Sequence, residues 1–132
     1  MANLTNEEMQ KKTIVGLTEK ITIKGQGPTK ELIARIDTGA TKSSIDLALA
    51  SELKLGPVVD SRLIKSAHGT KLRPVVEAEV RIRGRNLRAR FTIADRAHMK
   101  YEVLIGQNLL RMGFLVDPSQ RADSASEERP KK

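Results

Sequence analysis

The feature that most constrains the fold is an alternation of apolar and polar side chains over residues 76–82 and 87–93. Successive side chains of a β-strand point to opposite faces of a sheet, so the alternation predicts two strands that each bury one face. The apolar members are Val76, Ala78, Val80, Ile82, Leu87, Ala89, Phe91 and Ile93. The short interval between the stretches predicts that they form a hairpin.

The turn of this hairpin is predicted at Gly84-Arg85. With a two-residue turn there, the expected cross-strand pairs are Arg83 with Asn86, Arg81 with Arg88, and Glu79 with Arg90. One of these pairs is attractive and one is repulsive, each by roughly 0.2–1 kcal/mol. The arginines are therefore expected to gather toward the hairpin end.

Short apolar runs at close spacing predict further strands along the chain. The predicted strands cover residues 13–24 in two pieces, 31–36, 58–64, 72–82, 87–93, 103–105 and 114–116. Two short helices are predicted, one capped by Asp46 and reaching Leu53, the other within residues 107–112. Many short strands with one or two small helices indicate a mainly β domain, either a small barrel or a sandwich.

The length of 132 residues suits one domain with one modest core. We expect a flexible arm over residues 1–12, a folded domain over 13–118 and a polar, disordered tail over 119–132. The chain has no Cys and a net charge of +8, which excludes disulfides and favours polyanionic partners. Its polar start and the lack of roughly 18 consecutive apolar residues predict a cytoplasmic protein without membrane contact.

An acid follows directly after the apolar strand predicted at residues 31–36, in the sequence Asp37-Thr38-Gly39-Ala40. Taking an ionised carboxylate out of water is costly, so a carboxylate at this position needs donors. The hydroxyl of Thr38 and the backbone near Gly39 can supply them. A carboxylate held in this way can activate a water molecule. An ordinary Asp-Thr-Gly turn is the alternative for this motif by itself.

Several further stretches follow this motif in a fixed order. They are Arg73-Pro74-Val75-Val76, Asp95-Arg96, Leu104-Ile105-Gly106-Gln107-Asn108-Leu109-Leu110 and Phe114-Leu115-Val116-Asp117. As an ordered set, these stretches resemble the retropepsin-like aspartic proteases, and in particular the prokaryotic branch labelled ATP-dependent zinc proteases. The resemblance implies a small closed β-barrel of the retropepsin type over nearly the whole folded part.

The resemblance also implies a mechanism and a site. Aspartic proteases need two neighbouring carboxylates that share one proton, and this chain has one Asp-Thr-Gly, so two copies of Asp37 would pair in a homodimer. The implied catalytic residues are Asp37, Thr38 and Gly39. The implied substrate-binding residues are Ala40, Thr41, Ser66, Ala67, His68, Gly69 and Ile105, with residues 66–71 as the flap. Gly106 would allow the strand 103–105 to pack closely beneath the catalytic loop.

Two positions differ from the retroviral pattern. Retroviral enzymes usually carry an acid shortly after Asp-Thr-Gly-Ala and an Arg after the later Gly, whereas this chain has Thr41 and Gln107. Because both charges are missing together, we expect a neutral hydrogen bond between the side chains of Thr41 and Gln107 in place of the ion pair.

The zinc and ATP parts of the branch label find no support in the residues. The only histidines are His68 and His98, and there is no His-Glu-x-x-His motif and no phosphate-binding Gly-rich loop. We therefore expect neither a metal nor a cofactor.

The leading function is an aspartic endopeptidase acting on peptides, with acidic or glutamate-rich peptides as the expected class. Arg62, Lys65, Lys71 and Arg73 flank the expected flap and are the cations placed to contact such a substrate. The alternative is a catalytically silent basic module that binds protein or nucleic acid through the arginines at 81, 83, 85, 88 and 90. The scarcity of aromatics disfavours nucleic acid as a partner.

Overall fold

The computed structural model describes residues 3–123. The elements in chain order are α1 (Asn6–Gln10), β1 (Thr13–Val15), β2 (Thr18–Lys24), β3 (Thr29–Ile36), β4 (Ser43–Asp46), α2 (Leu47–Glu52), β5 (Asp60–Ser66), β6 (Gly69–Ile82), β7 (Arg85–Ala94), β8 (Val103–Ile105), α3 (Gln107–Leu110) and β9 (Phe114–Val116). The two strand pieces expected within residues 13–24 are confirmed, and Gly16-Leu17 separates them.

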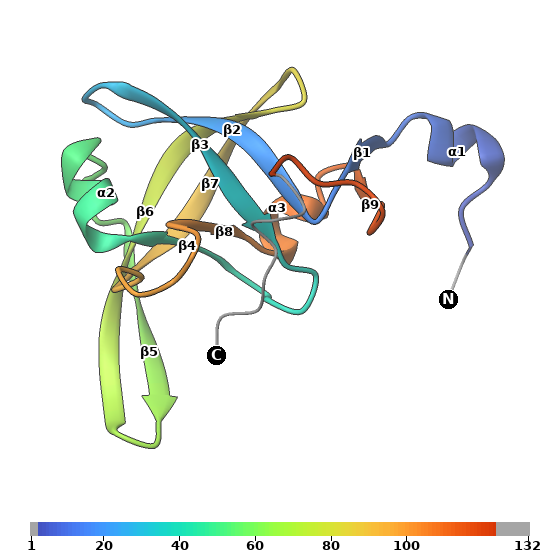
Figure 1. The fold of residues 1–132 in the computed structure, drawn as a ribbon. Coiled ribbons are helices and arrows are strands. Elements are labelled where there is room, and N and C mark those ends of the chain that lie inside the picture. The colour runs from blue at the N-terminus through green and yellow to red at the C-terminus, as the bar shows by residue number, and fades with distance from the viewer. Residues whose placement is uncertain (1–2, 124–132) are drawn as a thin grey trace.

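The main sheet closes into a small barrel (Figure 1). Its strand order is β2-β3-β8-β4-β7-β6-β5, and β2 also pairs with β6, so six strands form the closed part and β5 adds to the outside of β6. Phe91 and the isoleucines of β2 fill the interior and are almost completely buried. The predicted mainly β barrel is confirmed, with three short helices in the described residues.

The hairpin register predicted from the sequence is wrong. The turn is Arg83-Gly84, and the pairs are Arg81 with Asn86, Glu79 with Arg88, and Glu77 with Arg90. Arg83 and Gly84 have φ angles of 51° and 80°, as a two-residue turn that matches the twist of the strands requires. Acids therefore face arginines, and the repulsive arginine pair does not form.

The helix predicted after Asp46 is present as α2. The side chain of Asp46 accepts a hydrogen bond from the backbone N–H of Ala48 at 3.1 Å, which caps the helix. Leu49 and Leu53 are 1% and 0% exposed. The helix therefore covers one end of the barrel core, as its apolar spacing predicted.

A second, two-stranded sheet lies beside the barrel. β1 and β9 pair in parallel, with Ile14 opposite Leu115, and Figure 1 shows this pair projecting toward α1. We name it the terminal platform (residues 13–15 and 114–116). The arm expected over residues 1–12 contains α1, whose N-terminus has a capping box formed by Thr5 and Glu8.

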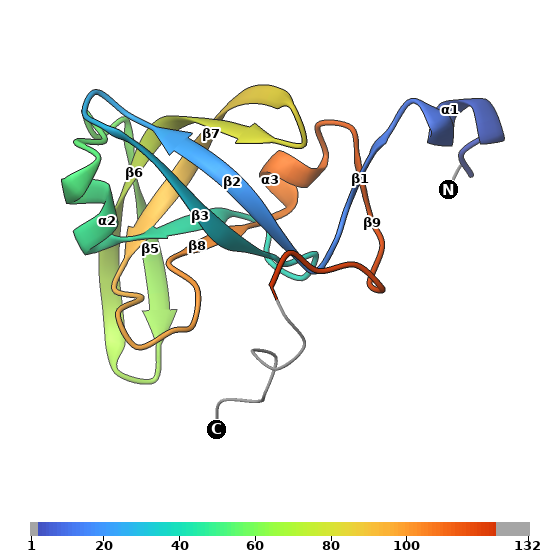
Figure 2. The ribbon, with the colours of Figure 1, turned by 45° about the horizontal axis from the view of Figure 1, so that its top comes forward.

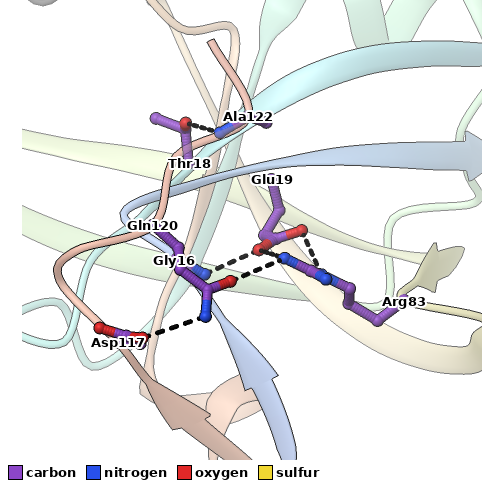
Figure 3. A network of polar contacts seen from close by, with 7 residues as sticks. All are labelled: Gly16, Thr18, Glu19, Arg83, Asp117, Gln120 and Ala122. Atoms are coloured by element: carbon purple, nitrogen blue, oxygen red, sulfur yellow. Dashed lines mark hydrogen bonds and ion pairs between the residues drawn. The ribbon is translucent and has the colours of Figure 1, made fainter. Parts of the chain in front are cut away.

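The segment after β9 departs from the disordered tail expected from residue 119. Gln120 accepts a hydrogen bond through its backbone carbonyl from the N–H of Leu17 at 2.8 Å. The N–H of Ala122 donates to Thr18 Oγ1 at 2.9 Å, as Figure 3 shows. The ordered chain therefore reaches Asp123, and residues 124–132 lie outside the described residues.

The turn of the long hairpin is tied to the same region. Arg83 donates two hydrogen bonds to the carboxylate of Glu19, at 2.9 and 3.0 Å, and one to Gln120 Oε1 at 3.2 Å (Figure 3). Glu19 also accepts from the N–H of Gly16 at 2.7 Å. The ion pair thus fixes the hairpin turn against the β1–β2 connection and the C-terminal segment.

Candidate active site

The Asp37 carboxylate lies in a short loop at the end of β3. The N–H of Asp37 donates to the Ile105 carbonyl in β8 at 2.9 Å, which continues the pairing of the two strands. The N–H of Gly39 donates to Asp37 Oδ1 at 2.9 Å. A Cβ on Gly39 would lie 3.3 Å from the same oxygen, so glycine lets the backbone donor approach the carboxylate. The side chain is therefore held in one orientation.

The connection between β8 and α3 supports the loop from beneath. A Cβ on Gly106 would lie 2.3 Å from the Lys42 carbonyl oxygen, so the close approach predicted for Gly106 is confirmed. The N–H of Gly106 donates to Ser43 Oγ at 2.9 Å, and that hydroxyl donates to Asn108 Oδ1 at 2.8 Å. No role was predicted for Ser43 or Asn108, because these bonds join residues far apart in the chain.

Gln107 binds the loop in a different way from the one expected. Its Nε2 donates to the Thr38 carbonyl at 2.7 Å, and its backbone N–H donates to the Ala40 carbonyl at 2.8 Å. Thr41 is exposed, and its carbonyl accepts from the N–H of Asn108. The prediction of a hydrogen bond between the side chains of Thr41 and Gln107 is wrong. The start of α3 binds backbone carbonyls of the loop instead.

The loop is open to solvent on its outer side. Thr38, Gly39 and Thr41 are exposed, and Asp37 and Ala40 are partly buried. Ile105, expected among the substrate-binding residues, is 0% exposed and packs in the core. Side chains alternate along β8, so Leu104 is the residue that faces outward.

A row of residues in register crosses the outer face of the sheet beside the loop. Arg35 is in register with Leu104, and Leu104 with Ser44. Ser44 is in turn in register with Thr92, and Thr92 with Val75. Residues in direct register lie on the same face of a sheet. We call this row of five residues the outer row, and it leads from the strand that carries Asp37 to the base of the β5–β6 hairpin.

A cleft of about 360 Å³ lies at the far end of the outer row. Its lining residues are Lys42, Asp60, Arg62, Val75, Glu77, Arg88, Ala89, Arg90, Thr92, Asn108 and Met112. Glu77 forms ion pairs with Arg88 and Arg90, and Asp60 forms one with Arg90. Within residues 3–123, Lys42 and Arg62 have no such acidic partner, so the cleft carries unneutralised positive charge.

Arg96 lies on the same side of the sheet, in the connection between β7 and β8. Its Nε donates to the Tyr101 carbonyl at 3.0 Å, and its Nη1 donates to Ser44 Oγ at 3.3 Å. Burial lowers the pKa of the guanidinium, while the negative charges of Asp46 and Asp37 oppose this shift. The stretch Asp95-Arg96 was part of the resemblance, but no local pattern in the chain predicts that it lies near Asp37.

The comparison with protein families shows to which family the chain belongs. Residues 48–127 match the model of the RimB-like family, described as the retropepsin-like aspartic endopeptidase RimB. The chain belongs to the RimB-like family. The match confirms the retropepsin-like resemblance of this RimB-like protein. It begins at residue 48, after the Asp37 loop, so the catalytic role of that loop stays a prediction.

Solved structures show the same fold. A Legionella pneumophila protein of unknown function (DUF785) matches with a TM-score of 0.56 at 19% identity, covering 83% of this chain and 95% of that one. Simian foamy virus protease matches with 0.55 at 23% identity, covering 71% and 91%. EIAV protease, in complex with an inhibitor, matches with 0.56 at 22% identity, covering 71% and 84%. No curated protein matches the sequence.

The hairpin expected to serve as the flap of this RimB-like protein is formed by β5 and β6. Its turn is at Ala67-His68, and Figures 1 and 2 both show it projecting from the barrel, apart from the loop that follows β3. Ala67, His68 and Gly69 are exposed; Ser66 is the last residue of β5. Leu63 and Leu72 form a register pair and are 60% and 69% exposed. The hairpin therefore presents apolar surface to solvent.

Residues 3–123 contain no group of three or more His, Cys, Asp or Glu side chains that could hold a metal ion. Among the helices of this described region, none combines the length and apolar character needed to cross a bilayer.

Proposed function

We propose that this RimB-like chain hydrolyses peptide bonds with two Asp37 carboxylates, one from each subunit of a homodimer. The observation that carries the proposal is the Asp37 carboxylate, which is oriented by the N–H of Gly39 at 2.9 Å and lies in a loop whose outer side is exposed. Thr38 and Gly39 are the other residues assigned to the catalytic loop. One carboxylate supplies a base and leaves no neighbouring acid, whereas two across a two-fold axis supply both.

The chemistry follows from one shared proton. The ionised carboxylate takes a proton from water while the water oxygen bonds to the peptide carbonyl carbon, and the protonated partner donates to the carbonyl oxygen. The resulting diol breaks its C–N bond when one carboxyl protonates the amide nitrogen and the other takes back a hydroxyl proton. Each peptide bond consumes one water, and the pair returns to its singly protonated state.

The terminal platform is the surface proposed for pairing the subunits. β1 and β9 hydrogen-bond to each other and lie outside the barrel. Ile14 is 40% exposed, which leaves apolar surface for a second copy. A two-fold interface there would be self-complementary and would set the two Asp37 loops relative to each other.

Acidic or glutamate-rich peptides are the proposed substrate class. Lys42 and Arg62 line the cleft at the end of the outer row without acidic partners among residues 3–123, and Lys65, Lys71 and Arg73 lie on the flap hairpin. Ala40 and Thr41, with residues 66–69 of the flap, would hold the peptide backbone. Positive charge around the path of the chain favours association with anionic peptides.

The alternative of a silent nucleic-acid-binding module is less well supported. Arg83 binds Glu19, and Arg88 and Arg90 bind Glu77. Arg85 donates to the carbonyls of Gly113 and Met112. Arg81 donates to Asn86, so all five arginines invoked for phosphate contacts are engaged within the protein.

The test compares wild-type protein with Asp37→Asn on a glutamate-rich fluorogenic peptide. Asn keeps the shape of the side chain and cannot share the proton, so we expect no turnover and an unchanged melting temperature. Wild-type protein mixed with excess Asp37→Asn should lose activity, because mixed dimers have one carboxylate. Full activity of the variant, or of the mixture, would contradict the proposal.

A further inference from the structure

The guanidinium of Arg96 lies on the outer row, near β3, the strand that leads to Asp37. Its Nη1 donates to Ser44 Oγ, and Ser44 is in register with Leu104, which is in register with Arg35. Asp37 lies two residues after Arg35 and one residue beyond β3, and its N–H still pairs with the Ile105 carbonyl. The alternation of side chains therefore places Asp37 on the same face as Arg35. Arg96 is therefore on the face of the sheet that also carries Asp37.

The hydrogen bonds of Arg96 leave part of its donor capacity unused. A guanidinium has five N–H donors in a planar fork. Nε is used by the Tyr101 carbonyl and Nη1 by Ser44 Oγ, while Nη2 has no partner among the described residues. No carboxylate of residues 3–123 forms an ion pair with this guanidinium. Asp46 binds the backbone N–H of Arg96 at 2.8 Å and not its side chain.

A partly buried cation with unused donors on a substrate-facing surface is suited to bind a carboxylate. The planar fork matches two carboxylate oxygens, and charge-assisted bonds of this kind are about twice as strong as neutral ones. The two bonds already present fix the orientation of the fork, which lowers the entropy lost on binding. The electrostatic influence of Asp37 on the Arg96 pKa agrees with a position close to the catalytic loop.

We propose that Arg96 is a specificity-determining residue that binds a carboxylate of the substrate residue next to the scissile bond. This inference rests on the proposed function and names the residue that recognises an acidic residue of the substrate. The carboxylate comes from a Glu or Asp side chain inside the peptide or from a free C-terminus. The two sources share one chemistry and are distinguished below.

The first experiment measures kcat/KM for wild-type and Arg96→Gln protein on peptides with Glu or Gln at the cleaved position. We expect the Glu-over-Gln preference to fall by about tenfold or more in the variant, with a much smaller change for the Gln peptide. Arg81→Gln is the matched control, because Arg81 is exposed and donates to Asn86 on the hairpin. An equal loss for both peptides, or an unchanged preference, would overturn the proposal.

A second arm distinguishes the two sources of the carboxylate. Each peptide is prepared with a free C-terminal carboxylate and with a C-terminal amide. If the side chain is bound, the amide leaves the effect of Arg96→Gln unchanged; if the terminus is bound, the amide removes it. An effect that depends on neither group would overturn the proposal.

A third measurement separates this inference from the proposed catalysis. Binding of the Glu and Gln peptides to Asp37→Asn protein is followed by fluorescence anisotropy, and the Arg96 Nε–Hε resonance by NMR. We expect tighter binding of the Glu peptide and a shift of that resonance with this peptide alone. Neither measurement depends on turnover, and the NMR measurement is made with Arg96 intact. Equal binding, or a resonance that does not respond, would contradict the role of Arg96 even if Asp37 proves catalytic.

Discussion

A Cβ on Gly106 would lie 2.3 Å from the carbonyl oxygen of Lys42 and 2.8 Å from that of Ala40. Both neighbours are backbone atoms of the loop that begins at Asp37, so no side chain can move aside to make room. The position of the Asp37 loop therefore depends on the absence of a side chain at this residue.

Gly106→Ala is predicted to displace the loop. Overpacking a well-fitted site costs roughly 1–3 kcal/mol in the free energy of unfolding, and a loop shift of even about 1 Å can lower activity by about a hundredfold. Urea unfolding and peptide hydrolysis measure the two effects. Wild-type stability and activity in this variant would show that the loop adapts without cost.

The Glu19–Arg83 pair is predicted to stabilise the fold more than the exposed pairs of the same hairpin. The Glu19 side chain is 6% exposed, and that of Arg83 is 46% exposed. Arg83→Met would leave the Glu19 carboxylate without its cation, and because Arg83 is partly solvated we expect a loss of about 1–3 kcal/mol in the free energy of unfolding.

Arg88→Met is the matched control for this prediction. Its partner Glu77 is 34% exposed and also binds Arg90, so removal of Arg88 is expected to cost about 0–1 kcal/mol. Equal losses in the two variants would show that burial of Glu19 has no energetic consequence.

Asp123 gives a prediction for acid stability. Its side chain is 2% exposed; burial raises its pKa, but hydrogen bonds from Tyr101, Thr18 and Arg121 outweigh burial and hold the pKa well below its usual value. A carboxyl whose pKa is lower in the folded state stabilises the fold above its unfolded pKa of about 3.9 and loses that contribution as the pH falls toward the folded value.

Asp123→Asn should therefore be less stable than wild type at pH 7, and the difference should shrink below about pH 4. Urea unfolding at several pH values measures this difference. A difference that stays constant from pH 7 to pH 3 would contradict the assigned role of Asp123.

Metal chelation is predicted to leave activity unchanged, because the mechanism needs two carboxylates and a water. Purified protein is assayed before and after treatment with EDTA. Loss of activity that zinc restores would contradict the two-carboxylate account.

Local sequence explains the parts of the fold that were predicted correctly. Asp46 caps α2 because its side chain bonds two residues ahead, a pattern visible in the sequence. The resemblance implied that the strand before Gly106 packs beneath the Asp37 loop, and the close approach of Gly106 to Lys42 and the pairing of β3 with β8 confirm it.

Contacts between distant residues explain the parts that were missed. The hairpin turn at Arg83-Gly84 is accompanied by the bond from Arg83 to Glu19, which lies in another strand. Thr18 holds the C-terminal segment through Ala122, so residues 119–123 do not follow the disorder that their polar composition predicted. No function was predicted for Arg96, because its contact with Ser44 arises only from the fold.

The most direct test of the central claim is the dependence of peptidase activity on protein concentration, measured alongside molar mass by light scattering. If two Asp37 carboxylates form the site, activity should rise with the square of the concentration well below the dimer dissociation constant and linearly above it, in step with the appearance of dimer. An active species that is monomeric, with activity linear in concentration throughout, would contradict the account and require a second acid within one chain.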